Sequence, residues 1–403
     1  MLTKLSLLVI LKFLMTSTFY PPYHVGGDAM HVKYLSEELT KLGHEVHVFY
    51  NKDAYIVKRR NLPRINESQR GVFTHEFGSR SNLSPYLAYF FGDVPSIDRK
   101  FNALVKEIRP DIVHHHNISL LGYRLLNNFG SYACIYTAHD YWLICPTNNL
   151  FKNQEEICVA KNCFSCSLRS KRIPQVWRSC RNFKMAIRNI DLLISPSEYV
   201  RKRLVQEIDV PSITLPNFVP YPPDNIPFSG HENYFLYLGM LEKHKGILNL
   251  LELFKEQRHN LNAKLVIAGG GSLSPYIREY IEKNSLSNSI SFLGFVDNLT
   301  KYSLYANALA VIIPSIWPEN APLVALEALS VGTPVITSSQ GGLPEIIEKV
   351  DKKLIFDNVS RLRDVLLSFS RNEFSSSKVK KVYEQNFSPK AYVDKYVEVV
   401  RGI

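Results

Sequence analysis

Short apolar runs alternate with amphipathic stretches along most of this 403-residue chain, and this alternation constrains the fold more than any other feature. Such a pattern is typical of parallel sheets that are covered by helices on both faces. The predicted strands are 11–18, 45–50, 112–114, 135–137 and 192–195 in the first half, and 235–238, 265–268, 290–292, 310–313 and 335–337 in the second. The sequence therefore predicts an α/β protein with doubly wound sheets.

A proline-rich segment interrupts the alternation near the middle of the chain. Residues 216–233, PNFVPYPPDNIPFSGHEN, contain five prolines and little periodicity, which is typical of a linker between domains. We therefore expect two tandem Rossmann-like domains, 1–215 and 234–385, and a terminal helix within 386–403. Open α/β sheets bind ligands at the carboxyl ends of their strands, so a site is expected in the cleft where two such edges face each other.

Two glutamates bracket the start of a helix that follows the predicted strand 310–313. Pro322 near the first turn and Asn320 near the N-cap place Glu319 just before this helix and Glu327 in its second turn. Free backbone N–H groups and the positive end of the helix dipole favour a phosphate in the preceding loop. Two carboxylates beside a phosphate suit the hydroxyls of a sugar. The alternative interpretation is an ordinary helix with solvated surface glutamates.

The run PSIWPENAPLVALEALSVGTPVITSSQGGLPEII, with glutamates eight residues apart, resembles the donor-site motif of the retaining family 4 glycosyltransferases, which have the GT-B fold. Further matches in the second half are YLGML followed by Lys245-Gly246-Ile247, the glycine run 269–271, and LGFV at 293–296. In the first half, the Gly26-Gly27 loop and the pair His139-Asp140 also match. The resemblance implies two Rossmann-like domains with an interdomain cleft and a terminal helix that crosses back to the first domain.

The resemblance implies a retaining glycosyltransferase that moves a sugar from a nucleotide-sugar donor to a glycan, lipid-linked or other hydroxyl acceptor. In the implied reaction the acceptor attacks the face that the diphosphate leaves, and the diphosphate accepts the acceptor's proton. No covalent nucleophile and no cofactor are implied, so the activity is expected to be metal-independent, of the hexosyltransferase type. The chain also lacks an Asp-x-Asp pair that would hold a metal-nucleotide complex.

The resemblance also assigns roles to individual residues. It implies that Lys245 holds the diphosphate, that Glu319 and His139 contact the sugar, and that Glu327 contacts the ribose. These implied catalytic residues are His139, Glu319 and Lys245. The implied donor-binding residues are Gly26, Gly27, Gly239, Lys245, Val296, Glu319, Leu323, Val324 and Glu327.

One position departs from the family pattern. Met240 stands where the family usually has an arginine, so one of two cations expected at the diphosphate is missing. Two other functions therefore stay open beside transfer: a sugar-nucleotide epimerase of the same fold, and a catalytically silent module that binds nucleotide sugars. Donor base, sugar and acceptor are not determined by the sequence.

Five of the six cysteines lie in segment 145–180 of the first domain: Cys145, Cys158, Cys163, Cys166 and Cys180. Cys163 and Cys166 have C-x-x-C spacing, and the order of the cysteines resembles a zinc knuckle. A structural zinc, disulfides and plain reduced thiols are all compatible with this pattern. The metal would be architectural, because the implied chemistry does not need it. His114, His115 and His116 are a weaker metal candidate, because alternation along a strand lets only the first and third meet one ligand.

The positive charge lies in the first domain. Residues 1–220 contain 28 Lys and Arg against 18 Asp and Glu, and residues 169–188 contain seven basic residues and no acidic one. Trp177 and Phe183 lie among these cations, so the segment predicts a basic amphipathic face for an anionic membrane or a phosphate-bearing lipid. A solvated basic face is the alternative. No recognition motif for nucleic acid accompanies the charge.

The apolar residues 5–15 are too short for a membrane span and are interrupted by Lys12, so they are interpreted as the first strand with a few leading residues. We therefore expect a cytoplasmic enzyme that is peripheral at the inner face of the membrane.

Overall fold

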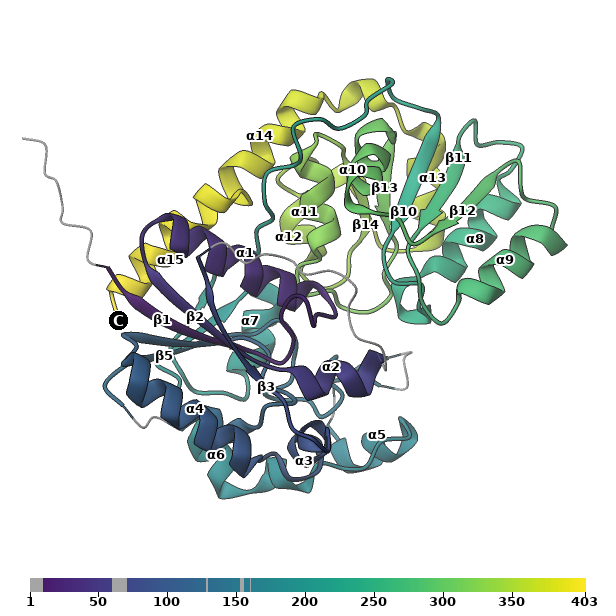
Figure 1. Ribbon diagram of the computed structural model, residues 1–403. Coiled ribbons are helices and arrows are strands. Elements are labelled where there is room, and N and C mark those ends of the chain that lie inside the picture. The colour runs from purple at the N-terminus through teal and green to yellow at the C-terminus, as the bar shows by residue number, and fades with distance from the viewer. Residues whose placement is uncertain (1–9, 60–70, 128–129, 153–155, 160) are drawn as a thin grey trace, which may run out of the picture.

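The computed structural model describes residues 10–403 except 60–70, 128–129, 153–155 and 160. It has two parallel sheets, one in each half of the chain, with helices on both faces (Figure 1). This confirms the predicted α/β architecture of two Rossmann-like units. Residues 5–9 of the apolar segment 5–15 lie outside the described residues.

The first sheet has the strand order β3-β2-β1-β4-β5-β8-β9, and all its neighbouring strands are parallel. In this order the strands are Phe73–Phe77, Glu45–Asn51, Lys12–Ser17, Ile112–His115, Ala133–Thr137, Leu192–Ser195 and Ser212–Thr214. The helices of this half are α1 (Gly27–Lys41), α2 (Lys52–Arg59), α3 (Ser84–Phe91), α4 (Pro95–Ile108), α5 (Cys163–Arg169), α6 (Arg181–Ile187) and α7 (Glu198–Val205).

The second sheet has the order β12-β11-β10-β13-β14-β15, again parallel throughout. Its strands are Ile290–Gly294, Lys264–Ala268, Tyr234–Leu238, Ala310–Ile313, Val335–Ser338 and Ile355–Phe356. Its helices are α8 (Ile247–Glu256), α9 (Ser274–Lys283), α10 (Asn298–Asn307), α11 (Leu323–Ser330), α12 (Leu343–Ile347), α13 (Val359–Ser368) and α14 (Ser376–Asn386).

The central strands are buried on both faces, because helices cover each side of each sheet. In β1, Phe13 and Met15 belong to one apolar cluster, while Leu14 belongs to the cluster on the opposite face. The last helix, α15 (Pro389–Arg401), packs Tyr392 and Tyr396 into the first of these clusters. Figure 1 shows α14 and α15 running from the second half back to α1 of the first.

The predicted strands missed both edges of the first sheet and one edge of the second, β15, whereas the other edge of the second sheet, β12, was predicted. The strand 192–195 was the last one predicted in the first half, but β9 follows it, and β3 was not expected at all. β3, FTHEF, is largely exposed and polar, and β9 and β15 are only three and two residues long. Edge strands of this kind carry no apolar run, so the pattern used for the central strands does not find them.

Candidate active site

The loop between β13 and α11 lies against the short 3-10 turn Lys243–Lys245 that follows β10. Gly246 makes this contact, with φ at 74°, and a Cβ at this position would lie 1.8 Å from the carbonyl oxygen of Pro314. Only glycine allows both the left-handed conformation and this close approach. As a result, Nζ of Lys245 lies 2.7 Å from Oε1 of Glu319.

Glu319 is a buried, charged carboxylate. Glu319 is 5% exposed, and the hydroxyl of Ser315 donates a second hydrogen bond of 2.6 Å to the same Oε1. Burial would raise the pKa of Glu319, but Lys245 and the hydrogen bonds outweigh this and hold the pKa below its ordinary value. Nζ of Lys245 also lies 4.9 Å from the centre of the Trp317 ring. The sequence placed Lys245 and Glu319 in one site but did not find Ser315 or Trp317.

The helix after this loop begins one residue later than expected. α11 starts at Leu323 with Pro322 at its N-cap, so the prediction of Asn320 near the N-cap was wrong. The side-chain amide of Asn320 instead donates a 2.6 Å hydrogen bond to the carbonyl oxygen of His139 in the other half of the chain. Leu323 and Val324 form the first two positions of the helix, and both are half-buried.

Glu327 is held by two residues of α10. Nζ of Lys301 lies 2.7 Å from Oε1 of Glu327, and the hydroxyl of Tyr305 donates to Oε2 at 3.0 Å. Neither partner was predicted from the sequence. Lys301 and Tyr305 stand four residues apart and therefore share one helix face, but a lysine and a tyrosine at this spacing are too common to indicate a site.

The remaining donor-binding candidates come from both halves of the chain. Gly239 follows β10, and a Cβ added there would meet no described atom within 4 Å, while the half-buried Val296 lies just before α10. From the first half, a Cβ at Gly27 would lie only 3.2 Å from Cδ1 of Leu323. The Gly26-Gly27 loop therefore approaches the N-terminus of α11.

Two further contacts join the halves near this point. The carboxylate of Glu345 accepts hydrogen bonds of 2.7 Å from the backbone N–H groups of Glu198 and Tyr199, so it caps α7 from the other sheet's helix α12. The amide of Asn217 donates to the carbonyl oxygen of Ala321 at 3.1 Å. Neither contact is predictable from spacing, since the partners lie more than 100 residues apart.

His139 lies at the carboxyl end of β5, next to two other imidazoles. His116 is hydrogen-bonded to it through Nδ1 and Nε2 at 3.0 Å, and the ring of His31 packs edge-on at 4.9 Å. Burial lowers the pKa of His139 to about 4, although the carboxylate of Asp28 opposes this shift. At neutral pH the side chain is therefore uncharged, and it can donate or accept a hydrogen bond but supplies no cation.

Asp140 is held by its own loop. Its two oxygens accept from the backbone N–H of Trp142 at 2.8 Å and from the amide of Asn148 at 3.3 Å. Burial raises the pKa of Asp140 to about 7, against the hydrogen bond from Trp142. Its hydrogen bonds fix the loop that carries His139.

The triple histidine is divided between two faces, as alternation requires. His114 uses both ring nitrogens within the protein, bonding Thr137 and Tyr396 at 2.8 Å each, and His115 bonds Thr16 on the other face at 2.8 Å. His114 therefore has no ring nitrogen left for a ligand that it could share with His116. Among described residues, the imidazole set whose nitrogens lie within 4.8 Å of one another is His31, His116 and His139.

The expected membrane anchors of the basic segment are core residues. Trp177 and Phe183 are 7% and 4% exposed, and both pack with Tyr123 and Trp142. The guanidinium of Arg178 lies 4.7 Å from the Trp177 ring and donates to the carbonyl oxygen of Trp142 at 2.5 Å. The prediction that these aromatic rings face a membrane was therefore wrong. In the described part of the chain, no helix is long and apolar enough to cross a membrane.

Comparison with known sequence families finds two matches that together span most of the chain. Residues 25–221 match the model of Glycosyltransferase Family 4, and residues 223–386 match that of Glycosyl transferases group 1. An uncharacterized glycosyltransferase of Methanocaldococcus jannaschii is 28% identical over 346 residues, which cover 84% of this chain and 83% of that protein.

Solved structures share the fold at low sequence identity. Sucrose-phosphate synthase from Thermosynechococcus elongatus superposes with a TM-score of 0.69 at 18% identity, covering 97% of this chain and 98% of that one. HepE of Anabaena, in a complex with UDP-glucose, superposes with a TM-score of 0.65 at 13% identity, covering 98% and 100%. These likenesses confirm the GT-B architecture.

Proposed function

The chain belongs to the family 4 type of glycosyltransferases, and from this premise we propose that it transfers a hexose, with retention of configuration, from a nucleotide sugar to a hydroxyl acceptor without a catalytic metal. The acceptor is proposed to be a glycan or a lipid-linked sugar. UDP-glucose is the first donor to test, because the structurally similar HepE was solved with it.

The observation that carries this proposal is the ion pair between the half-buried Lys245 and the buried Glu319, beside the N-terminus of α11. The lysine is 20% exposed at its side chain, so its charge is less screened than that of a surface lysine. Together with the free N–H groups at the start of α11, it supplies positive charge where a diphosphate would leave. The carboxylate of Glu319 orients Lys245 through Oε1, which leaves Oε2 for a sugar hydroxyl.

Glu327 is suited to bind the ribose of the donor. Lys301 and Tyr305 each contact one of its oxygens. An ionised carboxyl group has about four lone-pair sites, so two hydroxyls can still be accepted while the group stays in place. We assign the uncharged His139, whose carbonyl oxygen accepts a hydrogen bond from Asn320 of the other half, to contact the sugar from the opposite side.

The proposed reaction uses the protein to position and stabilise charge. The acceptor oxygen bonds to the anomeric carbon on the face from which the diphosphate oxygen departs, and the acceptor's proton passes to that departing oxygen. No side chain changes its covalent state in this scheme. Lys245 and the start of α11 stabilise the charge on the diphosphate, and Glu319 and His139 hold the sugar.

Met240 leaves this site with one lysine where the family pattern has two cations. Met240 is 56% exposed, and Lys243, three residues later, is also exposed. Among the described residues Glu319 pairs with Lys245 and not with Lys243, so Lys243 is not seen to take the place of the missing arginine. A weaker hold on the diphosphate is therefore expected, and assays need high donor concentrations.

The test is donor consumption with and without an acceptor extract, before and after EDTA. We expect UDP-sugar turnover that depends on the extract, forms an α-linked product from an α-linked donor, and survives EDTA. Free sugar without acceptor would indicate the epimerase, and donor binding without turnover would indicate a silent module. Activity lost in EDTA and restored by Mg²⁺ or Mn²⁺, with circular dichroism unchanged, would contradict metal independence.

We place the enzyme in the cytoplasm, with the basic segment 169–188 against anionic lipid, but with different apolar residues from those expected. Ile173, Val176 and Met185 are 59%, 69% and 46% exposed, and Arg172, Arg181 and Lys184 are exposed near them in sequence. Each basic residue near an anionic surface contributes about 1 kcal/mol, and salt weakens this attraction.

Co-sedimentation with vesicles that contain phosphatidylserine measures this binding. We expect the wild type to sediment at low salt and a variant with Arg172, Arg181 and Lys184 replaced by Glu to stay in solution. The matched control replaces Lys264, Lys283 and Lys349, exposed in the second half, by Glu. Equal binding of both variants would show that the attraction is not specific to this segment.

A further inference from the structure

Four cysteines that are spread over 22 residues line one small pocket in the first half of the chain, which we call the cysteine pocket: Cys145, Cys158, Cys163 and Cys166. The fifth cysteine of the segment, Cys180, is not among the lining residues, and its sulfur accepts the backbone N–H of Phe183 at the start of α6. The fold therefore brings four of the five cysteines of this segment to one pocket. Four thiolates are the number that a tetrahedral structural zinc site requires.

Three short pieces of backbone carry these thiols. Cys145 lies in a turn that its own N–H closes by bonding the carbonyl oxygen of Tyr141 at 2.8 Å. Cys158 directly follows the antiparallel hairpin of β6 (Phe151–Lys152) and β7 (Glu156–Ile157), and its N–H bonds Leu150 at 2.7 Å. Cys163 and Cys166 are the first and fourth residues of α5, so they share one face of its first turn.

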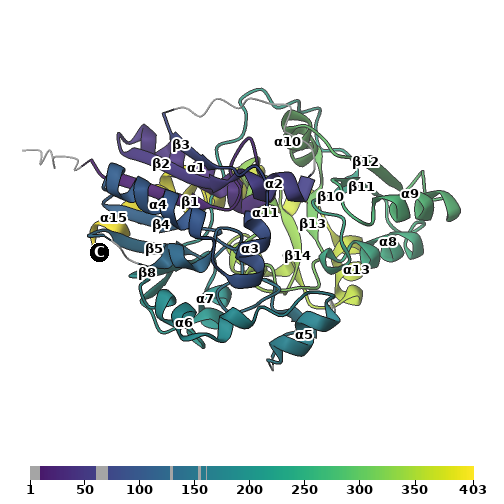
Figure 2. The ribbon, with the colours of Figure 1, turned by 60° about the horizontal axis from the view of Figure 1, so that its bottom comes forward.

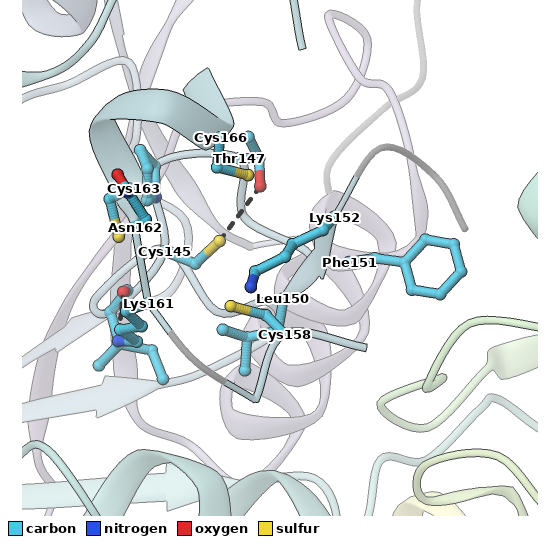
Figure 3. A pocket seen from close by; sticks show the side chains of 12 residues that line it. Cys145, Thr147, Leu150, Phe151, Lys152, Cys158, Lys161, Asn162, Cys163 and Cys166 are labelled. Atoms are coloured by element: carbon cyan, nitrogen blue, oxygen red, sulfur yellow. Dashed lines mark hydrogen bonds between the residues drawn. The ribbon is translucent and has the colours of Figure 1, made fainter. Parts of the chain in front are cut away.

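The four side chains line a common space without yet converging on one point. In Figure 3 the sulfur atoms of Cys145, Cys158 and Cys166 lie around the pocket, with Cys145 hydrogen-bonded to the hydroxyl of Thr147 at 3.2 Å, and Cys163 lies at its edge. Among the described residues, no three of these sulfurs lie within 4.8 Å of one another, so the thiols would have to turn inward to share one ion. Cys163 is exposed, so its thiolate would close the pocket from the solvent side after turning inward.

The volume of the cysteine pocket limits which ligand can bind in it. The free volume is about 10 Å³, which is close to one water-sized sphere. A single ion fits this volume, whereas an organic ligand or a four-iron cluster needs far more. Soft thiolate ligands in tetrahedral number favour zinc among the common single ions.

The charged residues around the cysteine pocket suit the charge of a zinc ion bound by four thiolates. Zinc with four thiolates carries two negative charges, and the pocket is lined by Lys152 and Lys161. Lys161 donates to the carbonyl oxygen of Ile144 at 2.9 Å, next to Cys145, and is also paired with the carboxylate of Glu207. These cations would offset the complex in a pocket that is otherwise mostly apolar.

The segment also needs a cross-link that its own packing does not supply. β6 and β7 have two residues each, and α5 has seven, with Phe164 and Leu168 60% and 55% exposed. Figures 1 and 2 show α5 at the periphery of the first half, away from the sheet. Pieces this small cannot bury enough apolar surface to hold their positions, and metals commonly stabilise such units.

From these observations we propose that the four thiolates of the cysteine pocket bind one structural zinc ion, which fastens the hairpin and α5 to the loop after β5. That loop also carries His139 and Asp140, and Tyr141 connects it to Cys145 by a backbone hydrogen bond. The zinc therefore acts on the active site by holding this loop and takes no part in the chemistry. The proposal does not depend on the reaction that the enzyme catalyses.

Metal analysis of the full chain, purified under reducing conditions without chelator from cells grown with zinc, tests this directly. We expect about one zinc and no stoichiometric iron per chain. Cys158→Ser and Cys166→Ser should each lose the zinc, and the matched control Cys180→Ser, in the same segment, should keep it. His31→Gln should also keep it, since the imidazole set around His139 is the competing metal site.

A second measurement covers the case in which the cysteine variants fail to fold. Titration of the wild type with a mercurial in the presence of a zinc-sensitive dye should release one zinc as the pocket thiols react, and cobalt in place of zinc should give a tetrahedral thiolate spectrum. A folded wild type without metal, iron with acid-labile sulfide, or zinc that is lost in His31→Gln but kept in Cys158→Ser and Cys166→Ser would each overturn the proposal.

Discussion

Replacing Lys245 by Met is expected to lower kcat by about 10²- to 10³-fold, the range found when one preorganised charge-stabilising group is removed from an active site. Lys245 is half-buried and paired with Glu319 beside the start of α11, and Met240 offers no second cation. The loss should fall mainly on kcat, because charge on the diphosphate grows as the bond to the sugar breaks.

Lys243→Met is the matched control, since Lys243 lies two residues away and is exposed. It should retain nearly full activity. Lys245→Met also leaves the Glu319 carboxylate buried without its cation, which destabilises the fold. The double variant Lys245→Met/Glu319→Gln should therefore recover thermal stability without recovering turnover.

Glu327→Gln provides a contrast within the same site. We expect it to weaken nucleotide binding by about 10- to 150-fold, which corresponds to about 1.5 to 3 kcal/mol for a hydrogen bond to a charged group. Glu319→Gln should leave nucleotide affinity much less affected and slow transfer instead. Calorimetry with UDP and steady-state kinetics separate the two effects, and an equal loss of UDP affinity in both variants would contradict the assigned roles.

The first half of the chain is expected to unfold on acidification, starting below about pH 6.5. Four histidines there are at most 1% exposed, and burial lowers the pKa of each from its ordinary value of 6.5: His31, His114, His115 and His116. The folded state therefore binds fewer protons than the unfolded chain below pH 6.5. Their stability contribution is fully present above that pH and decreases as the pH falls toward the folded-state values.

The expected decrease is large. Each histidine that is protonated only on unfolding removes about 1.4 kcal/mol per pH unit, so four remove about 5 kcal/mol per unit. Domains are typically stable by about 5 to 15 kcal/mol, so loss of structure is expected within about one to three pH units below 6.5.

Urea unfolding followed at several pH values measures this slope. His115, which burial shifts to a pKa of about 3, offers the sharpest variant, because His115→Gln should reduce the slope by one proton. His259→Gln is the control, since His259 is exposed in the second half and should leave the slope unchanged. A stability that stays level from pH 7 to pH 5 would contradict the prediction.

Much of the fold could be predicted because each central strand is a continuous run of apolar residues in the sequence. β10, β11, β13 and β14 were found within one residue of each end, since both of their faces are buried and apolar residues must fill them. The glutamate motif was likewise found from residues that are neighbours in the sequence. The two family matches also rest on the order of residues along the chain. The edge strands β3, β9 and β15 escaped because exposure removes that requirement.

The partners of the site residues could not be predicted in the same way. Glu319 and Glu327 were located by their spacing, but the cations that neutralise them lie 74 and 26 residues away, and only one of the two was named. Trp177 and Phe183 look like surface anchors in a basic segment, yet they are buried because Tyr123 and Trp142 cover them. The order of residues along the chain shows neither the ion pairs of the two glutamates nor the burial of the two aromatic rings, because both arise from packing between elements.

The sequence by itself determined the alternation of strands and helices, the break between the two halves, and the residue types that suit a nucleotide sugar, since each of these depends on neighbours along the chain. Only the tertiary structure decided which charges pair, which aromatic rings are buried, and which four of five cysteines share a pocket. The physical reason is that burial and pairing depend on distance in space. The folded chain sets those distances by packing segments that are far apart in sequence.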